Sequence, residues 1–248
     1  MVTVISGAGG GIGAATARAL ARTGRVVAAL DRDAEAVRET VETLRAEGLK
    51  VEGHAVDVSD TGRVEDLFAT LEHTAGPITE LVNVAGVLRP GTVLETSDED
   101  WAATFSTNAT GVFVLSRAAA RRMVPRGEGA IVTVSSNSGG VPRAGMAAYA
   151  ASKAAASHFT RCLGLELAPH GIRCNIVSPG STDTSMLAGL SAGDVIAGDP
   201  ASFRTGIPLG RVALPSDVAD SVLFLLSDRA RHITMHDLYV DGGATLRA

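Results

Sequence analysis

The sequence predicts a single α/β domain over residues 1–248, a doubly wound parallel sheet of about seven strands with helices on both faces. Short runs of apolar, often β-branched residues recur along the chain, which is typical of parallel strands buried on both faces. Helix-length segments separate these runs, and a glycine-rich turn joins the first run to the first helix. We find no internal repeat and no linker, so one domain is expected.

The expected elements follow in chain order from these patterns. Strands are expected at residues 2–5, 25–30, 51–56, 81–84, 130–134, 172–177 and 238–240. Helices are expected at residues 11–23, 33–48, from 60 onward, 97–123, 149–167 and 216–227. Residues 181–208 lack a strong period, and a segment of this length in a compact domain is expected to be a substrate lid.

The first strand, helix and strand form a Rossmann-type nucleotide-binding pattern. The turn Ser6-Gly-Ala-Gly-Gly-Gly-Ile-Gly13 lets the backbone approach a pyrophosphate at a helix N-terminus. Asp31 ends the second strand, where its carboxylate could accept hydrogen bonds from a ribose and repel a 2′-phosphate, or could cap the next helix. Arg32 could pair with a phosphate, but the glycine loop carries no basic residue, so the pattern favours NAD over NADP.

Later strands end in polar or small residues, at the sheet edge where such folds bind ligands. Asp57-Val58 follows the third strand, and its acid could contact adenine or cap the helix that starts near Asp60. The small residues of Asn83-Val-Ala-Gly86 would allow a cofactor to pass closely. Ser136 follows the fifth strand and could converge with residues of the next helix at the same edge.

Asn108 lies inside an expected helix. Ser97-Asp-Glu-Asp100 has the pattern of a capping box and predicts a helix that continues to about Met123. A mid-helix asparagine with Gly111 three residues later is unfavourable for that helix. Such a local violation indicates a functional residue, with a tolerated polar residue as the alternative.

Tyr149 and Lys153 lie one turn apart on one face of an expected helix. A free tyrosine has a pKa near ~10, and an ammonium at about 4–5 Å would lower it by roughly 2–3 units. Tyr149 is therefore predicted to transfer protons near neutral pH. On the pair alone, an amphipathic surface pair is the alternative. The small residues of this helix would suit close packing against another helix, even between subunits.

Composition narrows the possible functions. A net charge of −5 gives no basic field for nucleic acid or a membrane surface. No uncharged apolar run reaches the roughly 18 residues of a membrane span, and no signal peptide is seen, so a cytoplasmic protein is expected. Cys162 and Cys174 have no partners at metal-ligand spacing, which predicts reduced core thiols and no metal site.

Taken together, these motifs resemble the short-chain dehydrogenase/reductase family along essentially the whole chain. Ser6 and Val84 stand where that family more often has Thr and Asn, which are mild departures. The motifs that carry the resemblance are Gly7, Gly11 and Gly13 in G-x-x-x-G-x-G, Asn83-Val-Ala-Gly86, Asn108, Ser136, Tyr149-x-x-x-Lys153 and Pro179-Gly180.

The resemblance implies roles for these residues. Tyr149 would be the general acid/base, and Lys153 would lower its pKa and bind the nicotinamide ribose. Ser136 would bond the reacting oxygen, and Asn108 would hold a water in the proton relay. A homotetramer is also implied. The residues implied to bind NAD, besides Tyr149 and Lys153, are Gly7, Gly11, Ile12, Gly13, Asp31, Asp57, Val58, Asn83, Ala85, Gly86, Pro179, Gly180, Thr182 and Thr184.

From about residue 81 onward, the chain resembles the 2,3-dihydro-2,3-dihydroxybenzoate dehydrogenases of catechol-siderophore biosynthesis. Gly86-Val-Leu-Arg-Pro90, Pro142-Arg-Ala-Gly-Met146 and Gly206-Ile-Pro-Leu-Gly210 are among the similar segments. The resemblance implies NAD-dependent oxidation of a ring hydroxyl in a cyclic carboxylic acid, followed by aromatisation. Arg143 could then bind the ring carboxylate as a bidentate pair, with Arg89 as a second candidate, and a solvated loop arginine is the alternative for each. The apolar walls could be Met146 and Met186.

Other functions fit the same motifs. A trans-2,3-dihydro-3-hydroxyanthranilate dehydrogenase differs only in an amine for a hydroxyl. A 3-oxoacyl or other carbonyl reductase would prefer NADPH, which Asp31 disfavours. A nucleotide-binding scaffold without catalysis would keep the fold alone, which the set of Ser136, Tyr149, Lys153 and Asn108 disfavours.

Overall fold

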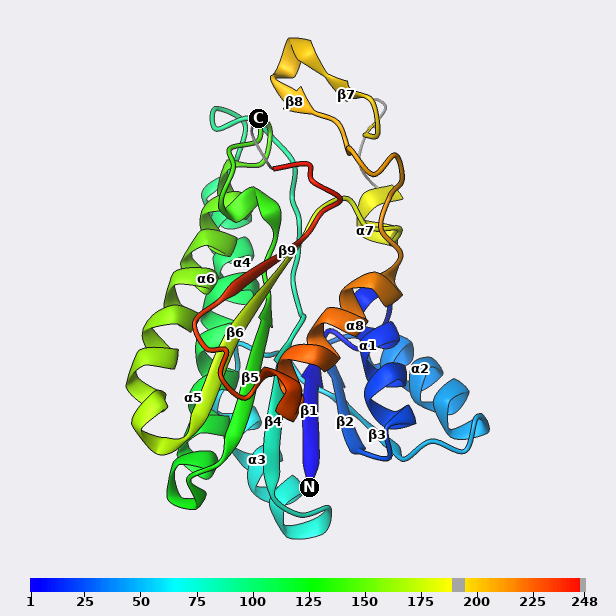
Figure 1. The fold of residues 1–248 in the computed structure, drawn as a ribbon, viewed down its shortest axis with the longest axis vertical. Helices are drawn as coiled ribbons and strands as arrows, with labels where there is room; N and C mark the ends of the chain where they lie inside the picture. Colours follow the sequence, from blue (N-terminus) through cyan, green and yellow to red (C-terminus); the bar gives the residue numbers. More distant parts are fainter. Residues whose placement is uncertain (189–194, 246–248) are drawn as a thin grey trace.

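The computed structural model describes residues 1–188 and 195–245, and it confirms the doubly wound parallel sheet (Figure 1). Its seven-stranded sheet has the order β3-β2-β1-β4-β5-β6-β9, with every pair parallel. The strands are β1 (Val2–Ser6), β2 (Val26–Asp31), β3 (Val51–Ala55), β4 (Ile78–Asn83), β5 (Gly129–Val134), β6 (Ile172–Pro179) and β9 (Asp237–Val240). A separate antiparallel hairpin joins β7 (Gly198–Asp199) to β8 (Arg204–Thr205).

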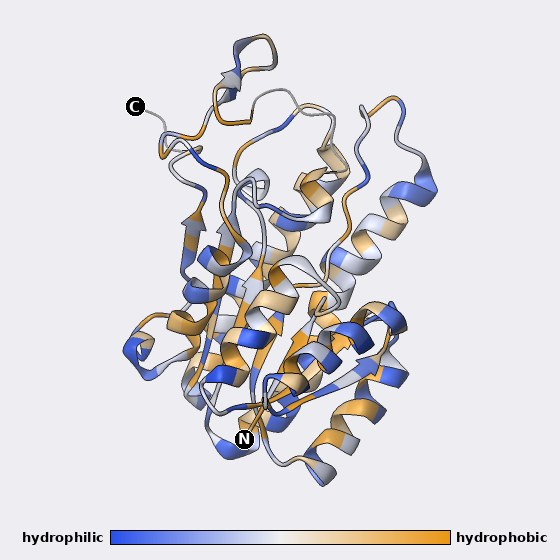
Figure 2. Cartoon of the chain, turned by 90° about the vertical axis from the view of Figure 1, so that its right-hand side faces the viewer, coloured by the Kyte–Doolittle hydropathy of each residue, from blue (hydrophilic) through white to orange (hydrophobic). Residues whose placement is uncertain are grey.

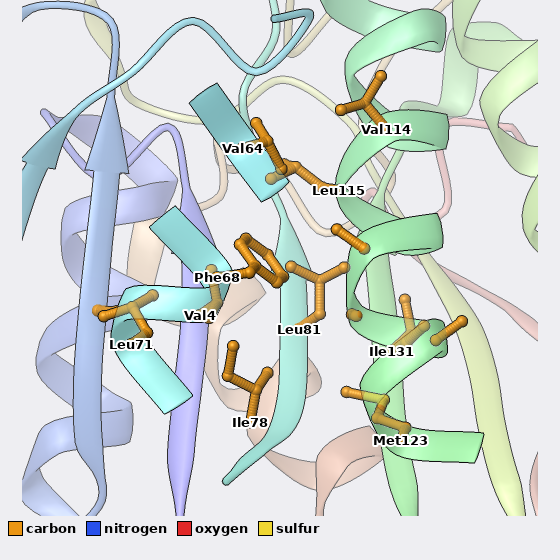
Figure 3. Packing of buried hydrophobic residues seen from close by; sticks show 14 of the residues in the cluster. Val4, Val64, Phe68, Leu71, Ile78, Leu81, Val114, Leu115, Met123 and Ile131 are labelled. Carbon is orange, nitrogen blue, oxygen red and sulfur yellow. The ribbon is translucent and has the colours of Figure 1, made fainter. Parts of the chain in front are cut away.

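Helices cover both faces of this sheet. They are α1 (Gly11–Arg22), α2 (Ala34–Ala46), α3 (Thr61–Thr74), α4 (Asp98–Phe105), α5 (Gly111–Met123), α6 (Ala147–Leu167), α7 (Ser185–Ala188) and α8 (Pro215–Leu226). α1, α2 and α8 share one apolar core with the sheet, and α3, α5 and α6 share the other. Figure 3 shows the second core, where Phe68 of α3 lies beside Leu81 of β4. The hydropathy colouring agrees, since the strands are mostly apolar and the blue residues lie mainly on the outer helices (Figure 2).

The strand order reverses beside β1, which pairs with β2 on one side and with β4 on the other. In folds of this kind the ligand crevice lies at such a switch point, outside the carboxyl ends of the strands. Those ends face upward in Figure 1, toward α7 and the β7–β8 hairpin. The topology therefore places the polar strand ends and these later segments at the same edge.

Close packing at the first turn requires glycine at two positions. Gly7 has a φ of +70°, a left-handed conformation that side chains rarely adopt. A Cβ on Gly13 would lie 1.8 Å from the Gly7 carbonyl oxygen, which is a severe steric clash. The first turn of α1 therefore sits directly on the turn that precedes it.

The expected continuous helix at residues 97–123 was wrong in one respect. α4 and α5 are separated by a π-helical segment, Ser106–Thr110, which contains the buried Asn108. Gly111 is the first residue of α5 and packs on the loop that follows β3. A Cβ built on Gly111 would lie 2.4 Å from Val58 Cγ2 in that loop. The unfavourable Asn and Gly thus mark a real irregularity, as π segments often do at functional sites.

Three smaller expectations need correction. β4 begins at Ile78 rather than at residue 81. Ser97 caps α4 by accepting from the Asp100 backbone N–H at 3.0 Å, but the Asp100 carboxylate pairs with Arg89 instead of completing the capping box. Cys162 is exposed on α6, so only Cys174 is a core thiol, and burial raises the pKa of Cys174 to about 12.

None of the helices that the structure describes has both the length and the apolar character needed to cross a membrane.

Candidate active site

A cavity of about 240 Å³ opens at the carboxyl edge of the sheet. Ser136 from the end of β5 and Tyr149 from the first turns of α6 both line it, together with Ile12 of the glycine turn. The predicted convergence of strand end, helix start and glycine loop is therefore present. Further lining residues come from the last residue of β6 and the segment that follows it, including Pro179, Gly180, Thr182, Thr184 and Met186.

A hydroxyl network fixes the direction of the Ser136 proton. The Ser136 Oγ accepts a hydrogen bond from the Ser138 backbone N–H at 3.2 Å and another from the Ser138 hydroxyl at 2.9 Å. Ser136 is also hydrogen-bonded to the Tyr149 side chain. Because both contacts from Ser138 occupy acceptor positions, the hydroxyl proton of Ser136 is free to point at the phenol oxygen. Ser138 was not predicted, although the Ser-rich stretch after β5 was the available signal.

Lys153 is buried directly beneath this pair. Its Nζ donates to the Val134 carbonyl oxygen at 3.0 Å and lies 5.8 Å from the centre of the Tyr149 ring. A Cβ on Gly86 would lie 3.2 Å from that Nζ, which explains the need for a small residue there. Burial lowers the pKa of the Lys153 ammonium to about 8.

The pKa of Tyr149 differs from the expectation. Burial raises the pKa of this phenol above its ordinary value, and the hydrogen bond from Ser136 opposes only part of that shift. The expected lowering relied on a free ammonium close to the phenol oxygen. In the structure the ammonium is bonded to a main-chain carbonyl, and removal of the phenolate from water dominates. Tyr149 is therefore a neutral phenol at neutral pH in the protein alone.

Asn108 acts as a clamp between three segments. Its Oδ1 accepts from the Val87 N–H at 2.8 Å, and its Nδ2 donates to the Val87 carbonyl and to the Ser152 Oγ, each at 2.9 Å. The π segment is thereby tied to α6 and to the loop after β4. Both side-chain donors are in use, and the predicted water-holding role of Asn108 stays a prediction.

The residues at the glycine turn fit a dinucleotide. Gly11 has a φ of +52°, and a Cβ there would lie 3.1 Å from the Thr184 Cγ2, so turn and later loop form one narrow cradle. Nothing lies within 4 Å of a Cβ built on Gly10, which leaves open space beside the N-terminus of α1. A pyrophosphate would be held here.

Asp31 closes the same site at the adenosine end. Its Oδ2 accepts from the Gly9 N–H at 2.9 Å, and its Oδ1 accepts from the Asp33 N–H at 3.0 Å. The N-cap of α2 is Asp33, not Asp31, so the alternative role as a cap does not apply. Each carboxylate oxygen of Asp31 keeps a further lone pair that could accept from a ribose hydroxyl.

Among the other predicted cofactor residues, Asp57 accepts hydrogen bonds within its own loop, whereas the side chains of Val58 and Asn83 contact neighbouring elements of the fold. Asp57 accepts from both the N–H and the hydroxyl of Ser59, and the hydroxyl contact is the largest cause that lowers the Asp57 pKa. The helix cap at this point is Asp60. The side chain of Val58 packs on Gly111, and that of Asn83 donates to Ser116 and Thr133 away from the edge. Val58 is thus packed against α5, while the Asn83 amide nitrogen is in use and its Oδ1 has no hydrogen-bond partner among the described residues.

The predicted substrate residues separate into two groups. Arg143, Met146 and Met186 line the cavity, as does Arg204, which was not singled out from the sequence. Arg89 is exposed, pairs with Asp100 and is not part of the lining. The predicted lid at 181–208 contributes Met186 and Arg204, and its residues 189–194 lie outside the described residues.

With this geometry in place, the comparison with known proteins assigns the family. The chain belongs to the short-chain dehydrogenase/reductase family, since residues 7–245 match the model described as enoyl-(acyl carrier protein) reductase. These enzymes are oxidoreductases that generally use a nicotinamide cofactor.

Two relatives and one solved structure are close. The chain is 55% identical to the 2,3-dihydro-2,3-dihydroxybenzoate dehydrogenase of Bacillus subtilis (strain 168), with 99% of this chain and 96% of the relative covered. It is 41% identical to the Escherichia coli (strain K12) enzyme described by the same words, covering 98% and 96%. The crystal structure of gox2181 superposes with a TM-score of 0.91 at 33% identity, covering 98% and 95%.

Proposed function

We propose that this protein oxidises 2,3-dihydro-2,3-dihydroxybenzoate to 2,3-dihydroxybenzoate with NAD as the acceptor. The observation that carries the proposal is the arrangement of the cavity, where Ser136 and Tyr149 lie together with Arg143. The first pair suits proton transfer from a carbinol, and the guanidinium suits a ring carboxylate. The printed names of the two relatives support the same substrate.

Each residue of the set has a part in the oxidation. The nicotinamide ring, when bound, supplies the hydride acceptor. The carbinol oxygen would take the place where Ser136 donates, and its proton would pass to the oxygen of Tyr149 in the ionised, phenolate form. Lys153 is buried under Tyr149, with its Nζ bonded to the Val134 carbonyl and 5.8 Å from the centre of the Tyr149 ring, so its positive charge would favour the phenolate form of Tyr149. The ring ketone that results becomes an aromatic phenol by shifting one ring proton to oxygen, which makes the oxidation effectively irreversible.

The choice of NAD over NADP rests on Asp31. Its carboxylate lies against the glycine turn, held by the Gly9 and Asp33 N–H groups, and would repel a 2′-phosphate. The exposed Arg32 has no ion pair among the described residues, and its charge is the one feature that would tolerate a phosphate.

The lid remains part of this proposal. Met186 of α7 and Arg204 of β8 both line the cavity, so the segment 181–208 would cover a bound substrate. Closure of such a segment would exclude water from the reacting atoms.

A substrate panel tests the proposed function. NADH formation is followed with 2,3-dihydro-2,3-dihydroxybenzoate and with trans-2,3-dihydro-3-hydroxyanthranilate, and NADPH consumption with a 3-oxoacyl thioester. We expect the first substrate and NAD to give the highest kcat/KM. A higher value with the amino substrate, or with the thioester and NADPH, would replace the proposed substrate. Wild-type protein that binds NAD but oxidises no carbinol would support a scaffold instead.

A further inference from the structure

We propose that Arg204 and Arg143 together bind the carboxylate of the substrate, with Arg204 as the residue that ties the lid segment to it. This inference rests on the proposed function and names the residue that selects an acidic substrate. Both side chains line the cavity that holds Ser136 and Tyr149. They come from segments far apart in sequence, the loop before α6 and strand β8.

The two guanidinium groups are available for an anion. Neither Arg143 nor Arg204 belongs to any ion pair among residues 1–188 and 195–245. Both are half-buried, and the one side-chain hydrogen bond of Arg204 within these residues is to the Ser181 Oγ at 3.3 Å. Half-buried cations without a carboxylate partner lose water without gaining a counter-charge, and an incoming carboxylate would supply it.

The carboxylate whose charge acts on Arg143, that of Asp241, already has hydrogen-bond partners. Asp241 influences the charge of Arg143 but does not line the cavity. Its two oxygens accept from the Thr245 hydroxyl at 2.6 Å, from the Gly243 N–H at 3.0 Å and from the Asn137 amide at 3.5 Å. Asp241 therefore stabilises the loop that contains it rather than neutralising the arginines.

The positive charges of Arg143 and Arg204 repel each other, which is consistent with a site for an anion between them. Burial lowers the pKa of Arg143 below its ordinary value, and the positive charge of Arg204 lowers it further. Two like charges that feel each other across a cavity form a strong site for an anion placed between them. Arg89 cannot take this role, because it faces Asp100 at the surface.

The hairpin holds Arg204 at a defined position. β8 pairs with β7 so that Arg204 lies opposite Asp199. The Thr205 hydroxyl donates to the Ala244 carbonyl at 2.7 Å, and the Ile207 N–H donates to the Ile196 carbonyl at 2.8 Å. A carboxylate bound by Arg204 and Arg143 would thus connect this hairpin to the loop next to the catalytic tyrosine, with the ring between them.

The test compares Arg204→Gln and Arg143→Gln with a matched control, Arg211→Gln. Arg211 is an exposed arginine that pairs with Asp217 at 2.7 Å and lies outside the lining of this cavity. Each variant is measured with 2,3-dihydro-2,3-dihydroxybenzoate and with the dihydrodiol that lacks the carboxylate. We expect Arg204→Gln to raise KM for the acid roughly 10- to 100-fold, with a much smaller change in kcat and no change for the uncharged diol. Arg204→Lys should recover part of the loss, because it keeps the charge but not the planar fork.

Two results would overturn the inference. One is an unchanged KM for the acid in Arg204→Gln, and the other is an equal loss for the acid and the uncharged diol. A large effect of Arg89→Gln on the acid alone would assign the role to that residue instead.

Direct binding separates this inference from the proposed function. Calorimetry with salicylate, a non-reacting ring acid, reports the carboxylate site without turnover. Salicylate binding that Arg204→Gln weakens, in a protein that oxidises no dihydrodiol acid, would retain the carboxylate site and reject the function. If the protein oxidises the dihydrodiol acid but Arg204→Gln leaves the affinity for salicylate unchanged, the proposed function is retained and the carboxylate site is rejected.

Discussion

The chemistry of single residues here depends on burial more than on sequence spacing. Tyr149 and Lys153 stand one turn apart, as the sequence predicts, yet both side chains are at least nine-tenths buried. Burial raises the pKa of the phenol and lowers that of the ammonium to about 8, so burial shifts each group toward its neutral form. The Ser136 hydroxyl, which is hydrogen-bonded to Tyr149, would then stabilise a developing phenolate.

This charge state gives a prediction for pH dependence. A raised pKa means that Tyr149 is protonated at neutral pH and becomes a proton acceptor only as the pH rises. We expect the kcat/KM for carbinol oxidation to increase from neutral toward alkaline pH. This increase is measured as the pH profile of NADH formation, over the pH range in which circular dichroism shows an intact fold. A profile that is flat from about pH 6 to pH 9 would show instead that the phenol is already ionised.

Two of the elements show how local irregularity positions the site. The π segment Ser106–Thr110 turns Asn108 toward the loop after β4, and three hydrogen bonds hold it there. The glycine turn brings the N-terminus of α1 against the Gly7 carbonyl. In both cases an asparagine or glycine that is unfavourable in regular structure indicated the position in the sequence. The contacts that these residues make are visible only in the folded structure.

The glycine turn gives a prediction with a control in the same loop. Gly13→Ala would place a Cβ 1.8 Å from the Gly7 carbonyl oxygen, so α1 must shift away from the turn. We expect a loss of about 1–3 kcal/mol in the free energy of unfolding, together with weaker NAD binding. Gly10→Ala, whose Cβ would meet nothing within 4 Å, should unfold like wild type.

Urea unfolding followed by circular dichroism measures both variants, and fluorescence titration measures NAD affinity. Equal stability of Gly13→Ala and Gly10→Ala would contradict the close packing of α1 on the turn.

At the scale of the whole molecule, the topology was accessible from the sequence and the substrate site was not. Apolar runs, glycine turns and strand-end residues act over short distances, and they predicted a doubly wound parallel sheet of about seven strands and the convergence of Ser136 with Tyr149. Arg204 reaches the cavity only because the hairpin of β7 and β8 lies over the sheet edge, a relation between distant segments that no local pattern contains. Arg89 is close in sequence to the Asn83–Gly86 motif, yet it pairs with Asp100 at the surface, and no local pattern shows that either.

The expected homotetramer stays a prediction. Phe113 of α5 and Leu165 of α6 are exposed apolar side chains that such an assembly could cover.

The central claim is that Tyr149 transfers the proton in the oxidation of a cyclic carbinol by NAD, and Tyr149→Phe tests it most directly. Turnover of 2,3-dihydro-2,3-dihydroxybenzoate and the affinity for NAD are measured side by side in the variant and the wild type. The account predicts unchanged NAD affinity and a loss of turnover by several orders of magnitude, since phenylalanine keeps the ring but not the oxygen. Turnover of Tyr149→Phe within a few-fold of wild type would contradict it.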